Sequence, residues 1–317
     1  KEFASMSYDT IQKALAGKEL NLENINSLNF EDQNLKQGKG MIMRILDSGS
    51  TMEEAYEQLD GIIDHYSNQL NSQYKIDFNG RLTNDDPNDI TDTNYGNANV
   101  IGSKDDEIHG THVSGIIAAK RNNGIGMNGV AHNVKIMAVR AVPDGDEYDK
   151  DVALSIRYAV DNGANVINMS LGGGYIPPQI IRDAIRYAND NNVICVMAAG
   201  NSFDENPSEA ISPEAPGSYA SEYGIVVGAI DEAGNMTSFS NRAGQPVDWD
   251  NNGAKELLYV TTSGQAIWST LPGNMIGTKS GTSMACPLIA AAVAILLQAD
   301  PSLRPDQIRV LLANTTK

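Results

Sequence analysis

The chain has 317 residues, enough for one large domain or two modest ones. Its 40 Asp and Glu against 23 Lys and Arg give a net charge of −17, which argues against docking on nucleic acid or on an anionic membrane surface. A composition that is 41% hydrophobic and 20% charged excludes the fibrous and disordered classes of protein.

The first 36 residues carry a weak helical pattern with many Asn and Asp, and we expect them to form an extension packed on the outside of a core that begins at residue 37. The chain begins with Lys1 and has no basic-then-apolar leader, which indicates a processed or trimmed form. Its longest unbroken apolar run, residues 288–297, is shorter than the ~18 residues of a membrane span. We therefore expect a soluble protein without a membrane span.

Short apolar runs alternate with helical patterns along the rest of the chain. The runs are apolar on both faces, as is typical of buried parallel strands. They cover residues 41–46, 134–139, 166–169, 193–198 and 225–230. Helical spacing recurs between them, for example over residues 152–160 and 181–188. This alternation predicts an α/β fold with a mostly parallel sheet.

Ligands of such sheets bind beyond the carboxyl ends of the strands. Asp47 directly follows the first predicted strand, residues 170–174 follow the third, and Gly200 and Asn201 follow the fourth. A helical pattern at about residues 51–70 begins close to Asp47 and predicts a helical insertion there.

Two motifs carry the side chains of nucleophilic catalysis. His109 and His112 lie in His-Gly-Thr-His-Val-Ser-Gly, and Ser283 lies in Gly-Thr-Ser-Met-Ala-Cys-Pro at the start of the longest apolar helix. An alcohol nucleophile needs a base, a carboxylate that holds the base, and donors where the oxyanion forms. Ser283, His109 and Asp47 can fill the first three roles, and the side-chain amide of Asn201 can fill the last.

Other chemistries fit the spacing poorly. Residues 124–129 match a G-x-G-x-x-G fingerprint, but they follow a helical pattern and precede a predicted strand, the reverse of a dinucleotide site. His109 and His112 lack the Glu and the third ligand of a zinc protease. An α/β-hydrolase places its acid and histidine after the serine, whereas both precede Ser283.

The order Asp47, His109, Asn201, Ser283 resembles that of the subtilisin-like serine proteases of bacterial type. Residues 168–173, residues 280–287 and the two closing helical patterns are also similar to that family, so the resemblance covers about residues 37–317. It implies a catalytic domain over 37–317, built as a three-layer sandwich with a mostly parallel central sheet and helices on both faces.

The resemblance implies a serine endopeptidase that forms an acyl-enzyme at Ser283. His109 would be the general base and later the acid, Asp47 would orient its imidazole, and Asn201 would donate its amide to the oxyanion together with the main-chain N–H of Ser283. His112 would be structural, either buried or hydrogen-bonded.

The same resemblance implies where a peptide substrate binds. An extended peptide would pair along an edge formed by Ser170, Leu171 and Gly172. The opposite wall of the primary specificity pocket would be formed by Ala198, Ala199 and Gly200. Main-chain pairing makes little demand on sequence, so broad specificity is expected. Four acids near the presumed pocket rim motivate the hypothesis of a preference for Lys or Arg next to the scissile bond: Asp204, Glu205, Glu209 and Glu214.

The implied chemistry needs no cofactor. A structural calcium stays open, because the family often holds one in the loop that corresponds to residues 121–127, where Asn123 is the candidate ligand but no carboxylate is present. Cys195 and Cys286 lie in apolar runs and are expected to be reduced core residues.

Polypeptide substrates and the chain's own pro-region are the expected partners of a monomeric enzyme that is secreted or held in the cell envelope, with an intracellular location left open. Two alternatives also stay open. One is a peptide ligase or cyclase on the same scaffold, in which the helix after Asp47 would shield the acyl-enzyme from water. The other is a catalytically silent peptide-binding module, which has no support because all four catalytic positions are filled.

Overall fold

The structure is a computed structural model that describes residues 2–47, 52, 67, 83, 85–101, 108–142, 147–219, 223–253 and 257–315. The chain divides into two compact units, Lys1–Gly80 and Arg81–Lys317. The predicted boundary after residue 36 falls inside a helix of the first unit. The helical insertion predicted at about 51–70 lies almost entirely outside the described residues.

The first unit contains the helices α1 (Glu2–Leu15), α2 (Leu22–Asn26) and α3 (Gln33–Asp47). The side chain of Asn21 caps α2 by accepting a 2.9 Å hydrogen bond from the N–H of Asn24. Ile11, Ile25 and Ile42 are fully buried in a small core of this unit.

The strand predicted at residues 41–46 is wrong, because these residues form the second half of α3. A short apolar run does not by itself distinguish a buried strand from the buried face of a helix. Here Gly38 and Ile42, one helical turn apart, are both buried, whereas Arg44 is exposed, so the burial follows the period of a helix.

The second unit is built on a parallel sheet of four strands in the order β1-β2-β3-β4. The strands are β1 (Val166–Met169), β2 (Ile194–Ala198), β3 (Gly224–Ile230) and β4 (Tyr259–Ser263). The first three confirm the strands predicted at 166–169, 193–198 and 225–230.

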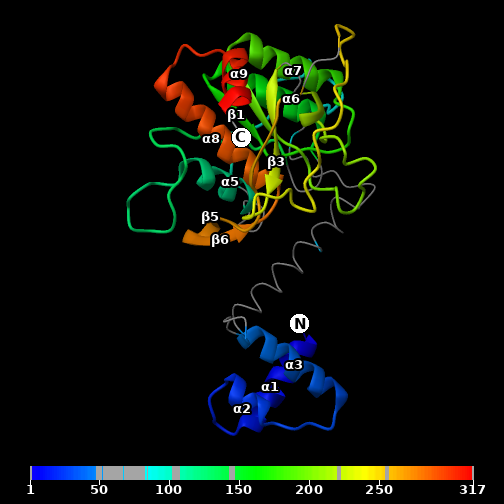
Figure 1. Cartoon of the computed structure of the whole chain (residues 1–317), viewed down its shortest axis with the longest axis vertical. Coiled ribbons are helices and arrows are strands. Elements are labelled where there is room, and N and C mark those ends of the chain that lie inside the picture. Colours follow the sequence, from blue (N-terminus) through cyan, green and yellow to red (C-terminus); the bar gives the residue numbers. More distant parts are fainter. Residues whose placement is uncertain are drawn as a thin grey trace. The chain divides into compact units, whose positions relative to one another are not determined.

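Helices cover both faces of this sheet (Figure 1). Cys195 and Met197 of β2 pack with α6 (Asp149–Asp161) and α7 (Gln179–Asp190) on one face. The intervening residues of β2, such as Val196, pack with α8 (Thr282–Ala299) and α9 (Pro305–Thr315) on the other face. This alternation produces the expected three-layer sandwich. Cys195 and Cys286 are free and buried, as expected.

The strand predicted at residues 134–139 is also wrong, since this stretch has no regular secondary structure. Ile136, Met137 and Val139 are 45%, 41% and 38% exposed. A strand requires a neighbour to pair with, and this stretch pairs with no strand among the described residues. Because no described strand pairs with its other side, β1 is an edge strand of the described sheet.

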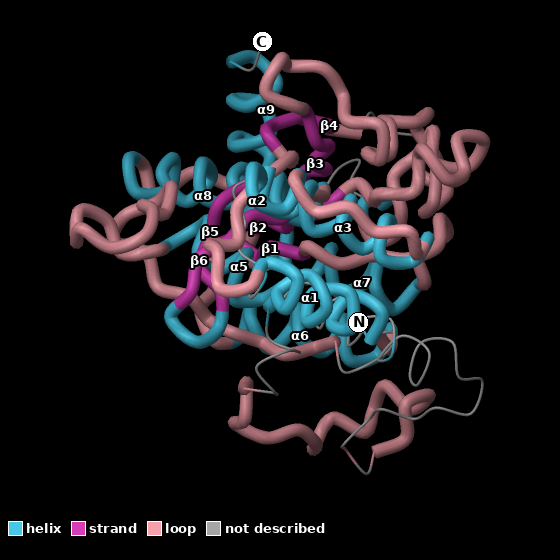
Figure 2. The backbone as a smooth tube through the Cα atoms, turned by 90° about the horizontal axis from the view of Figure 1, so that it is seen from below, coloured by secondary structure: helices cyan, strands magenta, loops and turns pink. Residues whose placement is uncertain are grey.

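A hairpin that the sequence did not predict supports the helix α5 (Ile108–Ala118). Its strands are β5 (Ile267–Leu271) and β6 (Met275–Lys279), and it lies beside α5 in Figure 2. The hydroxyl of Ser269 donates a 2.6 Å hydrogen bond to the main-chain oxygen of His112. Gly115 permits this approach, because a Cβ there would collide with the side chains of Ser269 and Thr270.

A buried ion pair holds the loop at residues 85–95 on α6. Lys150 Nζ lies 2.6 Å from Asp85 Oδ2, and the two side chains are 2% and 1% exposed. The ammonium also donates to the main-chain oxygen of Asp86 and lies 4.5 Å from the centre of the Tyr95 ring. Because it is enclosed by acceptors and an aromatic face, this buried charge is well compensated.

By length and composition α8 is the one helix of the described residues that could cross a membrane. Its buried residues pack on the sheet, however, and the core helix of a globular unit passes the same test of length and hydropathy. The helix is therefore weak evidence for a membrane span.

Candidate active site

The starts of two helices carry the predicted nucleophile and base. His109 lies in the first turn of α5 and Ser283 in the first turn of α8. Met284, next to Ser283, packs in one cluster with Val113 and Ile116 of α5. This apolar contact holds the two helices together near their first turns.

The main chain around Ser283 is held by Ser170, the first residue after β1. Pro287 lies four residues after Ser283 and has no N–H, so the carbonyl of Ser283 lacks its ordinary helical partner. The hydroxyl of Ser170 donates to that carbonyl at 2.8 Å and so replaces the missing bond. In return, the hydroxyl of Ser283 donates to the main-chain oxygen of Ser170 at 3.3 Å.

The side-chain amide of Asn201 is oriented by Thr282. The Thr282 N–H donates to Asn201 Oδ1 at 2.8 Å, and the Thr282 hydroxyl donates to the same oxygen at 3.1 Å. The hydroxyl also accepts a 3.2 Å hydrogen bond from the N–H of Gly200. These bonds occupy the oxygen of the amide and leave its NH2 group available as a donor beside Ser283.

His109 has the electrostatics of a base that stays neutral. The surrounding protein lowers its pKa below the ordinary value by desolvation, and the neighbouring side chains of Lys279 and His112 lower it further. Its side chain is nevertheless open to solvent. Among the described residues no carboxylate acts on its pKa, and His109 forms no hydrogen bond with Ser283.

His112 is buried and lies within hydrogen-bond distance of a main-chain oxygen, as the resemblance implies. It is fully buried, and its Nε2 lies 3.2 Å from the main-chain oxygen of Gly277 in the β5–β6 hairpin. Burial lowers the pKa of this imidazole, so the neutral ring is favoured.

Asp47 is not at the end of a strand. It is the last residue of α3 in the unit Lys1–Gly80, and its side chain is exposed. The expectation that a sheet would carry this carboxylate to His109 therefore has no support from the fold of the described residues.

The predicted peptide edge and pocket wall follow β1 and β2. Gly172 is exposed along the edge, whereas Ala198, Ala199 and Gly200 are buried. The segment at residues 213–216 joins the two: the N–H of Gly173 donates to Ala215 O at 3.0 Å, and the N–H of Glu214 donates to Ala199 O at 2.9 Å. The structure thus brings together six predicted positions, namely Ser170, Leu171, Gly172, Ala198, Ala199 and Gly200.

The structure gives no support to the calcium site that the resemblance implies for the loop at residues 121–127. It contains no carboxylate, and the side-chain oxygen of Asn123 already accepts a 3.0 Å hydrogen bond from the N–H of Ile125. In the part of the chain that the structure describes, no group of three or more His, Cys, Asp and Glu side chains is arranged to hold a metal ion.

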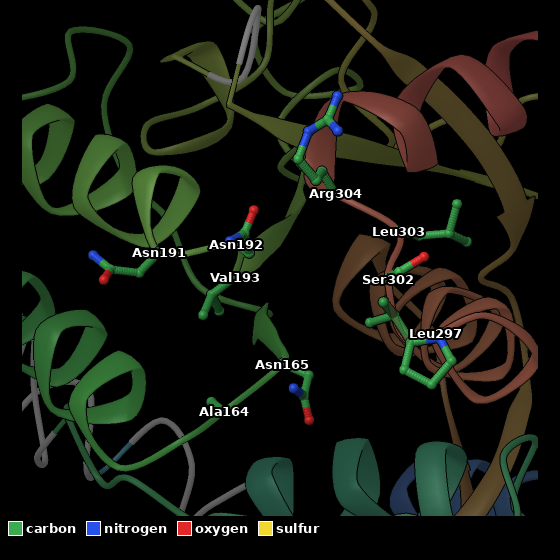
Figure 3. A pocket seen from close by; sticks show the side chains of 10 residues that line it. Ala164, Asn165, Asn191, Asn192, Val193, Leu297, Ser302, Leu303 and Arg304 are labelled. Atoms are coloured by element: carbon green, nitrogen blue, oxygen red, sulfur yellow. The ribbon is translucent and has the colours of Figure 1, made fainter.

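A separate cavity of about 330 Å³ lies at the other end of the sheet. Asn165, Asn192 and Arg304 line it (Figure 3), and the first two precede β1 and β2. It therefore lies away from the carboxyl ends of the strands, where Ser170 and Asn201 are found.

Sequence reasoning assigned no role to Thr282 and did not single out Lys279. The position of Thr282 beside the serine was a signal, but its role depends on a contact with Asn201 that only folding creates. Lys279 shows no local pattern, and its effect on His109 follows from the position of β6.

Known proteins resemble this chain over most of its length. The sequence profile of the Subtilase family matches residues 38–317. A thermophilic serine proteinase of Bacillus sp. (strain AK1) is 41% identical over 189 residues, which are 59% of this chain and 42% of that protein. The cell wall-associated protease of Bacillus subtilis (strain 168) is 36% identical over 212 residues, 67% of this chain and 21% of that protein. The chain thus spans less than half of these two relatives.

The fold is also similar to a solved structure. A cold adapted subtilisin-like serine proteinase matches with a TM-score of 0.52 and 30% identity, over 65% of this chain and 67% of that one.

Proposed function

This chain belongs to the subtilase family, and on that premise we propose that it is a serine endopeptidase that cleaves peptide bonds through an acyl-enzyme at Ser283. The observation that carries the proposal is the pair of hydrogen bonds from Thr282 to Asn201 Oδ1. They aim a side-chain amide donor at the start of the helix that carries the serine, where an oxyanion would form.

The proposed steps use the side chains of Ser283, His109 and Asn201. The hydroxyl of Ser283 attacks the scissile carbonyl, and its proton passes to His109, which later protonates the leaving amine. The negative oxygen accepts hydrogen bonds from the Asn201 amide and from the main-chain N–H of Ser283. Attack requires the Ser283 hydroxyl to exchange its bond with Ser170 O for one with His109.

The carboxylate that orients His109 stays a prediction from chain order, with Asp47 as its candidate. Its exposed position at the end of α3 gives it no structural support. The proposal for Ser283, His109 and Asn201 does not depend on this assignment.

We propose polypeptides as substrates, which would pair along residues 170–172 with few demands on their sequence. The catalytic domain would run from residue 37 to 317 and act as a monomer, and the chain's own pro-region would be a further partner. A location in the cell envelope or outside the cell is supported by a relative that is named a cell wall-associated protease. The ligase alternative is not favoured, because the relatives are named as a serine proteinase and a cell wall-associated protease.

Labelling tests the proposal. The protein is treated with a serine-directed phosphonylating reagent, digested and mapped by mass spectrometry, with Ser283→Ala and Ser280→Ala as paired variants. We expect one adduct on Ser283 that persists in Ser280→Ala, and hydrolysis of unmodified peptides into free ends. A folded protein with no adduct on Ser283 would refute the proposal, and joined or cyclic products would indicate a ligase.

A further inference from the structure

The base of the proposed specificity pocket is a short segment that connects its two walls. The N–H of Ala215 donates to Gly174 O at 2.9 Å on the side of the peptide edge. On the side of the opposite wall, the N–H of Glu214 donates to Ala199 O at 2.9 Å. Glu214 therefore lies between the walls, and not on a loop outside them.

The side chain of Glu214 turns toward the wall at residues 198–200, which precedes Asn201. Its carboxyl carbon would lie 2.5 Å from a Cβ at Gly200, so only a glycine at residue 200 leaves space for it. The hydroxyl of Ser202 donates to Glu214 Oε1 at 2.6 Å. The side chain is half-buried, whereas Asp204, Glu205 and Glu209 are exposed.

Glu214 lacks a cationic partner within the described residues. The pKa of its carboxyl is raised, first by burial and also by the negative charge of Glu147. Tyr175, which follows the peptide edge, has its own pKa raised by burial and by the charges of Glu214 and Glu209. Hydrogen bonds from Ser202 and Asn241 favour the charged carboxylate but only partly offset these effects, so a cation placed beside it would gain from the pairing.

We propose that Glu214 is the specificity-determining residue of this pocket and that it selects the cationic side chain of Lys or Arg on the residue before the scissile bond. The inference rests on the proposed function and narrows its substrate class. Of the four acids that the sequence brought to attention, Glu214 is the one that lies between the walls. The three exposed acids face solvent, where an ion pair is worth little.

The test compares matched peptides that differ at that one residue: Arg, Lys, Gln and Glu. For the wild-type protein, kcat/KM should be at least about tenfold higher for Arg and Lys than for Gln, and lowest for Glu. Glu214→Gln should abolish this ratio, because kcat/KM for the Arg and Lys peptides falls toward that for the Gln peptide. The control Glu205→Gln, which alters an exposed acid, should keep the ratio.

The pH dependence gives a second readout. The titration of His109 affects cleavage of both peptides alike. It therefore cancels in the ratio of kcat/KM for the Lys peptide to kcat/KM for the Gln peptide. It should rise with pH as Glu214 ionises, at a pH above the usual range of a glutamate, and stay flat in Glu214→Gln. The other ionisable groups of this region, Glu147, Glu209 and Tyr175, are retained in this variant.

A binding measurement separates this inference from the proposed function. Ser283→Ala protein is titrated calorimetrically with the uncleaved Arg and Gln peptides, and tighter binding of the Arg peptide is expected whether or not the wild type cleaves. Cleavage without a preference for Arg and Lys, or a preference that survives in both Glu214→Gln and Glu214→Ala, would overturn the inference. Absence of cleavage of any peptide by the wild type would overturn the proposed function instead.

Discussion

The main-chain N–H of Thr282 donates a 2.8 Å hydrogen bond to Oδ1 of Asn201. An N–H group can pair only with the oxygen of an amide, so this bond determines which end of the Asn201 side chain remains free. The donor is the residue before the proposed nucleophile, and the acceptor follows the predicted wall at residues 198–200. One bond thus ties the position of the proposed oxyanion donor to the position of Ser283.

Asn201→Asp tests this relationship because Asp keeps the acceptor for Thr282 and removes the NH2 donor. We expect kcat to fall by about 10²–10³-fold with little change in KM, since the lost hydrogen bond would form with the transition state. Steady-state kinetics on one peptide measures it. A loss below tenfold would show that Asn201 is not the oxyanion donor.

The acid side of the pH profile tests the environment of His109. Burial and the Lys279 cation lower the pKa of this imidazole, so its neutral form should persist below the ordinary pKa of histidine. Lys279→Met removes a positive charge that opposes protonation; the pKa of His109 should rise, and the acid limb of kcat/KM should move to higher pH. The exposed Lys120→Met serves as control. A limb that stays in place or moves to lower pH would contradict the assignment of His109 as the base.

Asp47→Asn decides the third member of the proposed triad. The chain order of the sequence predicts a loss of roughly 10⁴-fold in kcat/KM. Steady-state kinetics of this variant beside His109→Ala measures the loss, and a value within about threefold of wild type would remove Asp47 from the proposed triad.

Lys150→Met tests the buried ion pair that holds residues 85–95 on α6. Removing the ammonium leaves the carboxylate of Asp85 buried without this cation, so the free energy of unfolding should fall by about 3–5 kcal/mol. Arg304→Gln breaks a pair whose side chains are 56% and 65% exposed, and it should cost less than about 1 kcal/mol. Urea unfolding curves measure both, and equal losses would show that burial does not distinguish the two pairs.

Local patterns predicted much of the core. The strands β1, β2 and β3 and the helices α6 and α7 follow apolar spacing that each segment carries within itself, and the burial of Cys195 and Cys286 follows from the same runs. The strand predictions at 41–46 and 134–139 were wrong. The first segment has a helical burial period, and the second pairs with no strand among the described residues.

The sequence by itself determined the kinds of groups present, their order, and the serine and histidine motifs at the starts of two helices. Only the tertiary structure decided which groups meet. It brought Thr282 to Asn201 across 81 positions, set Glu214 between the predicted pocket walls while three other acids stayed exposed, and left Asp47 at the end of a helix. The reason is physical: periodicity and turn preferences act over a few neighbouring residues, whereas such contacts depend on how the strands and helices pack.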